Sequence, residues 1–305
     1  MAGADHLLTP QALAFLQKAL GVERQELREV TTTSAGMTNR SFRFVCRDRA
    51  YILRVPGEGT DRLIDRRKEA ASYAALAGDP ITDEIVAFDP ETGYKLTVYW
   101  DSTRNCDPAN WQEVAECMAL LRQFHSKRLR VDHEFDLFGE IEFYESLREG
   151  PSEYPDYQTV RERCFRLRPF IESLPRDHIL IHVDAVPDNF LFVNRPEGDE
   201  LHLIDWEYAG MQDPHLDVAM FAIYAGYGRR ELDRLIDLYF EDACDGDTRL
   251  KIYCYVALSG LLWSNWCEYK KALGVEFGDY AATQYRYGAE YSRLVLETLG
   301  QRSKP

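Results

Sequence analysis

The chain has 305 residues, 45% of them apolar, so it is long enough to bury a full hydrophobic core without disulfide or metal support. Its net charge of −15 argues against nucleic acid and anionic membranes as main partners. Seven dispersed cysteines without a CxxC pair indicate reduced thiols in the cytoplasm, and the absence of about 18 uninterrupted apolar residues argues against membrane insertion.

The first hundred residues predict a small sheet with one inserted helix. Helical spacing of Leu13, Leu16 and Leu20 predicts a short helix over 11–20, and no signal peptide is evident there. Strict alternation over 41–46, followed by an apolar run, predicts a pair of strands. The remaining elements predicted in this part are a helix over 61–76 and strands near 84–89 and 94–100.

After Trp100 the pattern becomes mostly helical. Helices are predicted over 108–126, 141–149, 156–173, 214–226, 229–242, 246–273 and 279–299, with a strand pair near 189–193 and 201–205. We therefore predict an α+β, bilobal protein-kinase-like fold. Residues 1–100 would form a small N-terminal β-sheet lobe with one helix, which binds nucleotide, and residues 101–305 a larger, mostly helical lobe for catalysis and acceptor binding. This outline alone does not decide function, because one fold serves many activities.

The strongest functional signal is a pair of short apolar runs with polar residues at their ends. Asp184 and Asn189 have the D-x-x-x-x-N spacing of a kinase catalytic loop, and Asp205 follows the second run. Phosphoryl transfer needs a carboxylate that accepts the proton of the attacking hydroxyl, and oxygen ligands that hold magnesium. The pattern predicts both.

Several further segments resemble the choline/ethanolamine kinase family, especially its bacterial LicA-like branch, within the kinase-like phosphotransferases. The matching stretches lie at 35–39, 53–60, 181–192, 201–208, 209–217 and 263–266. The resemblance covers the chain from about residue 30 to 290 and implies a kinase that uses ATP and Mg²⁺.

This resemblance implies roles for the residues of the catalytic segment. Asp184 would be the catalytic base, and Asn189 and Asp205 the magnesium ligands. His182 would support the catalytic loop through hydrogen bonds, and Asp217 would brace it as an acceptor.

It also implies a nucleotide site in the first hundred residues. Thr38 and Asn39 would lie in the loop over the phosphates. Arg54 would take the place of the strand lysine of protein kinases and pair with Glu69 on the following helix. Glu207 has two alternative roles, near a second magnesium ion or facing solvent.

The acceptor site is expected near the C-terminus, where aromatic residues are frequent. Trp263 and Trp266 share a face of a predicted helix, and aromatic faces bind quaternary ammonium groups. The resemblance places these two and Tyr280 around a choline head group, while an aromatic stripe in the core is the alternative.

Two positions depart from the family pattern. Val183 stands where the family often has asparagine beside the base, and Tyr224 aligns where choline kinases commonly carry an acidic residue. Both leave the base and the metal ligands in place. The second weakens the choline assignment in particular.

Three functions therefore stay open. The first is a kinase for choline or a related amino alcohol, and the second a phosphotransferase for an aminoglycoside, sugar or hydroxy amino acid. The third is a catalytically silent kinase fold that acts as a binding module. The aromatic residues favour the first, and retention of Asp184, Asn189 and Asp205 argues against the third. The oligomeric state stays open.

Overall fold

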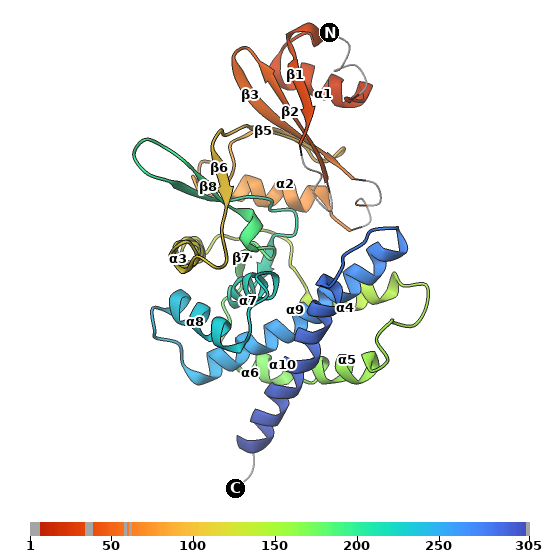
Figure 1. Cartoon of the computed structure of the whole chain (residues 1–305), viewed down its shortest axis with the longest axis vertical. Coiled ribbons are helices and arrows are strands. Elements are labelled where there is room, and N and C mark those ends of the chain that lie inside the picture. The colour runs from red at the N-terminus through yellow and green to blue at the C-terminus, as the bar shows by residue number, and fades with distance from the viewer. Residues whose placement is uncertain (1–6, 34–38, 58–59, 61–62, 303–305) are drawn as a thin grey trace. The chain divides into compact units, whose positions relative to one another are not determined.

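The computed structural model describes residues 7–33, 39–57, 60 and 63–302, which form two compact units (Figure 1). The first unit comprises residues 1–105 and 190–209, and the second comprises residues 106–189 and 210–305. The segment 190–209 packs with the first unit because its strand β8 pairs with β6. The sequence prediction had divided the chain once, near residue 100, because strand pairing between distant segments leaves no local signal.

The first unit is built on an antiparallel sheet with the strand order β1-β2-β3-β5-β4, beside a smaller sheet of order β6-β8-β9. Its elements are α1 (Pro10–Leu20), a 3₁₀ turn (Arg24–Glu26), β1 (Arg28–Thr32), β2 (Asn39–Cys46), β3 (Arg49–Pro56), α2 (Arg66–Ala75), β4 (Ile85–Asp89), β5 (Tyr94–Val98), β6 (Thr103–Asn105), β8 (Phe190–Val193) and β9 (Glu200–Leu203).

Alternation along β2 creates the core of this unit. Phe42, Phe44 and Cys46 lie on one face of the sheet, where Leu16 of α1 packs against them. Antiparallel pairing of β2 with β3 sets Ser41 opposite Arg54. The sheet therefore fixes the position of Arg54 through its register.

Helix α2 begins later than the sequence pattern indicates. Asp65 caps it by accepting hydrogen bonds from the backbone N–H groups of Arg67 and Lys68, so the helix begins at Arg66. This start places Glu69 in the first turn of the helix, with its side chain buried.

The second unit is mostly helical. Its elements are α3 (Trp111–Ser126), α4 (Leu137–Ser146), α5 (Tyr157–Phe165), α6 (Arg168–Ser173), β7 (Ile179–Ile181), a 3₁₀ turn (Pro187–Asn189), β10 (Gly210–Gln212), α7 (His215–Tyr224), α8 (Arg229–Phe240), α9 (Gly246–Ala272) and α10 (Tyr280–Arg302). Helix α9 is buried on nearly all sides and packs against α4, α7 and α10, which makes it the centre of this unit.

The structure also differs from the prediction in how many elements it contains. The single helix predicted over 156–173 is divided into α5 and α6, and Pro169, which has no N–H to donate, lies in the first turn of α6. Strands β6, β7 and β10 were not predicted because three residues are too few to show alternation. Among the described residues, no helix combines the length and apolar character needed to cross a membrane.

Candidate active site

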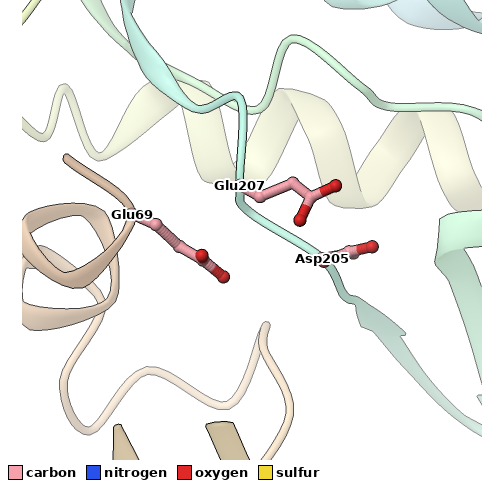
Figure 2. A group of neighbouring side chains, drawn as sticks. All are labelled: Glu69, Asp205 and Glu207. Carbon is pink, nitrogen blue, oxygen red and sulfur yellow. The ribbon is translucent and has the colours of Figure 1, made fainter. Parts of the chain in front are cut away.

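A buried cluster of charges occupies the first unit. Arg54 of β3 points one guanidinium nitrogen at Glu69, at 2.6 Å from its Oε1, and the other at Asp205, at 3.0 Å from its Oδ1. Glu207 lies 3.6 Å from the same arginine. Figure 2 shows that Glu69 approaches from one segment, and Asp205 and Glu207 from another. The first segment is α2, and the second follows β9.

A second arginine completes this cluster, and the sequence analysis did not identify it. Arg66 donates to Glu69 at 2.8 Å and to Glu207 at 2.9 Å. Asn39 also donates to Glu207, at 2.8 Å, and accepts from Arg66. The spacing of three residues between Arg66 and Glu69 was a signal that could have linked them.

The surroundings of Glu207 exclude one of its two predicted alternatives. Its side chain is only 2% exposed and is held by Arg66 and Asn39. The alternative in which Glu207 faces solvent is therefore wrong.

The cluster carries more negative than positive charge. Three carboxylates against two guanidinium groups leave one formal negative charge. Burial and the neighbouring Glu207 carboxylate raise the pKa of Asp205 to about 6, against the opposing effect of Arg54. Burial also acts to raise the pKa of Glu207, but Arg54 and Arg66 outweigh it and lower that pKa.

These carboxylates fit a divalent cation. One oxygen from each of Glu69, Asp205 and Glu207 lies within 4.8 Å of the others. Asp205 is the most accessible of the three, with its side chain 33% exposed. Carboxylate oxygens are ligands that Mg²⁺ takes, and the excess negative charge favours a bound cation.

The catalytic-loop pattern lies in the second unit, after β7. The side-chain amide nitrogen of Asn189 donates to the Asp184 backbone oxygen at 2.8 Å and to its carboxylate Oδ2 at 3.0 Å. The two residues five positions apart are therefore in direct contact. The bond orients the Asp184 carboxylate, which is partly exposed.

Asp217 holds the backbone immediately before Asp184. Its carboxylate accepts from the N–H groups of His182 at 2.9 Å and Val183 at 2.7 Å. A ring nitrogen of His125 lies 3.0 Å from the same carboxylate. Sequence analysis missed His125, since a single buried histidine at the end of a helix carries no distinctive pattern.

Val183 has an uncommon backbone conformation. Its φ of +68° is rare for a β-branched residue, and its side chain is fully buried. The bonds to Asp217 help to hold this strained residue next to the proposed base. Asn adopts this conformation more easily than a β-branched residue does.

The aromatic residues form a continuous row in the second unit. Successive ring centroids from Trp263 to Trp266, Phe277, Tyr280 and Tyr224 lie 5.8, 5.3, 6.4 and 5.9 Å apart. The two tryptophans are 7% and 3% exposed, so they are largely packed into the core, whereas Tyr280 and Tyr224 are only half-buried. Burial raises the pKa of Tyr280, and so do Cys267, Asp184 and Tyr224.

For the residues predicted to bind nucleotide, the structure gives the contacts but not the role. Arg54 and Glu69 form an ion pair, and Asn39 is bonded to Glu207, but nucleotide binding by all three stays a prediction. Thr38 lies outside the described residues.

Comparison with known proteins gives consistent matches along most of the chain. The phosphotransferase enzyme family matches residues 29–253. Protein LicA of Haemophilus influenzae is 27% identical over 259 residues, which cover 81% of this chain and 75% of that protein.

Two solved structures are similar over still more of the chain. Choline kinase LicA from Streptococcus pneumoniae is 29% identical, with a TM-score of 0.79, and the match covers 92% of this chain and 97% of that one. A structure of LicA in complex with AMP is 28% identical, also with a TM-score of 0.79, and the match covers 94% and 100% of the two chains. The predicted α+β, kinase-like fold is confirmed.

Proposed function

The chain belongs to the phosphotransferase enzyme family, and on this premise we propose that it is an ATP- and Mg²⁺-dependent kinase for choline or a related amino alcohol. The resemblance noted in the sequence is confirmed, and the chain is a phosphotransferase. One observation carries the catalytic part of the proposal: the side-chain amide of Asn189 donates to the carboxylate of Asp184.

The proposed mechanism assigns the proton transfer to Asp184. Its carboxylate accepts the proton of the acceptor hydroxyl while the hydroxyl oxygen bonds to the γ-phosphorus of ATP. The bond from that phosphorus to the β,γ-bridging oxygen breaks, and ADP leaves with the electron pair. Asn189 orients that carboxylate, and Asp217 fixes the backbone before it. These contacts favour the reaction because little reorganisation is needed when the acceptor binds.

ATP is the proposed phosphoryl donor. The related LicA structure with AMP supports a nucleotide co-substrate. In the first unit, Arg54 provides a buried guanidinium group whose forked donors suit phosphate oxygens. Glu69 would keep that arginine in place, and Asn39 and Thr38 would lie over the phosphates.

Mg²⁺ is the proposed cofactor. When bound, it would neutralise charge on the nucleotide phosphates. Asn189 and Asp205 are the proposed ligands, and the excess negative charge around Asp205 supports its assignment. Glu207 would hold Arg66 and Asn39 beside Asp205.

Choline or a related amino alcohol is the proposed acceptor. The relative from Streptococcus pneumoniae is named a choline kinase, and the aromatic row offers ring faces to a cation. Of the three residues expected to bind the acceptor, Tyr280 is the most exposed. Trp263 and Trp266 would pack behind it in the aromatic row, through Phe277.

A phosphate-transfer screen tests this function. The protein is incubated with ATP and Mg²⁺ together with choline, ethanolamine, sugars or aminoglycosides, and the product is identified by phosphorus NMR. We expect a phosphorylated amino alcohol. Transfer only to a sugar or aminoglycoside would contradict the proposed acceptor, and nucleotide binding without any transfer would indicate a silent binding module.

The variant Asp184→Ala tests the base within the same assay. We expect its kcat to fall by at least about 100-fold, because proton abstraction is lost. Its ATP affinity, measured by calorimetry, should stay close to that of the wild type. A variant that keeps substantial turnover would show that Asp184 is not the base.

A further inference from the structure

Tyr224 connects the end of α7 to the catalytic loop. It is the last residue of the helix, and its hydroxyl donates to Oδ2 of Asp188 at 2.7 Å. Asp188 is exposed, and in the sequence it lies between the proposed base, Asp184, and Asn189. The bond therefore holds a surface carboxylate in one place, beside the residues proposed to carry out the chemistry.

This carboxylate lies at the end of the aromatic row. The ring of Tyr224 contacts that of Tyr280 edge to face, at 5.9 Å and 64°. Burial raises the pKa of both tyrosines, and the charge of Asp184 adds to the effect on each of them. Through Tyr224, the carboxylate of Asp188 and the rings of Tyr224 and Tyr280 thus lie in one part of the second unit.

A ring face and a carboxylate are complementary to the same kind of group. The ring attracts a cation through its quadrupole, and the carboxylate attracts it through its full charge. A neutral group of equal size gains only the contact with the rings. Such an arrangement discriminates by charge rather than by shape.

We propose that Asp188, held in place by Tyr224, supplies the negative charge that selects a positively charged acceptor over a neutral one of the same shape. This inference rests on the proposed function, since it concerns the acceptor of that reaction. It makes Asp188 a specificity residue in addition to the base and the metal ligands.

The test compares choline with 3,3-dimethylbutan-1-ol, which has the same shape but no charge. Asp188→Asn removes the charge and keeps an oxygen that accepts from Tyr224. We expect the ratio of kcat/KM for choline to that for the neutral alcohol to fall about fivefold in this variant. Tyr224→Phe keeps the charge but removes the hydrogen bond from Tyr224 to the carboxylate, and should give a smaller fall in the same direction.

Asp242→Asn is the matched control, because Asp242 is likewise exposed and the substitution removes one negative charge from the loop after α8. It should leave the ratio unchanged. An unchanged ratio in Asp188→Asn, or equal losses for both acceptors, would overturn the inference, since the second result assigns Asp188 only to loop geometry.

Calorimetric binding of choline separates this inference from the proposed function. If the wild type transfers phosphate neither to choline nor to a related amino alcohol, the proposed function fails. Weaker choline binding by Asp188→Asn than by the wild type would still support the charge role. Equal binding by the two proteins, or none by the wild type, would overturn it.

Discussion

At the scale of single residues, Arg54 balances the buried carboxylates of the first unit. Its side chain is 6% exposed and contacts Glu69, Asp205 and Glu207. Burial acts to lower its pKa, but these carboxylates together outweigh burial and raise it. Arg54 therefore stays charged, and its positive charge offsets the free-energy cost of keeping these carboxylates in the interior.

We predict that Arg54→Ala lowers the free energy of unfolding by about 3–5 kcal/mol, because it leaves three carboxylates around a single buried guanidinium group, that of Arg66. Arg49→Ala is the control on the same strand. The Arg49–Glu84 pair is more than half exposed, so its loss should cost under about 1 kcal/mol. Urea denaturation measures both, and similar losses in the two variants would contradict the structural importance of the buried pair.

At the scale of elements, the close approach of α9 and α10 organises the second unit. Gly260 of α9 has no side chain, and this allows the α10 backbone to come near. A Cβ at this position would lie 2.5 Å from the backbone oxygen of Gln284 and 2.8 Å from the backbone nitrogen of Gly288. Because backbone atoms, unlike a flexible side chain, cannot turn aside, this contact sets the separation of the two helices.

We predict that Gly260→Ala destabilises the protein by about 1–3 kcal/mol, since the added methyl group forces the helices apart. Gly300→Ala on α10 is the control because, among the described residues, no atom outside the neighbouring residues and backbone of its own helix lies within 4 Å of the added Cβ. There alanine should be neutral or stabilising by up to about 1 kcal/mol, owing to its higher helix propensity. Thermal unfolding of the two variants tests this difference. Equal changes in Tm for Gly260→Ala and Gly300→Ala would refute it.

At the scale of the whole molecule, acid stability depends on buried groups. His215 stands at the start of α7, close to the buried Asp213–Lys251 ion pair. Burial lowers the pKa of His215 to about 4, and Lys251 and His125 add to this against the opposing effect of Asp213. The unfolded chain, with a histidine pKa near 6.5, therefore binds more protons between these two values.

We predict that the free energy of unfolding falls as the pH drops from about 6.5 toward 4, in part through His215. His215→Phe keeps a ring against Tyr239 and Phe240 but cannot take up a proton. Between pH 7.5 and pH 5, the wild type should lose about 1–2 kcal/mol more than this variant. Parallel losses, measured by urea denaturation at both pH values, would show that His215 does not contribute.

Several features were predictable because they depend on neighbours in the sequence. Alternation identified β2 and β3, helical spacing identified α1, and the length of α9 follows closely the predicted 246–273. The D-x-x-x-x-N spacing also identified Asp184 and Asn189 as neighbours, because residues five positions apart can meet across one tight loop. Family membership followed from these short motifs taken together.

The partners of each side chain were decided by tertiary structure. The sequence offered Arg66 as one charge among many on a helix, and only folding buries it against Glu207, 141 residues away. Tyr224 and Asp188 likewise meet only because α7 ends beside the catalytic loop. The sequence by itself determined the family, the main elements and the groups available for phosphoryl transfer. The tertiary structure alone decided which charges are buried and paired, because burial and pairing depend on distances between segments that no local pattern records.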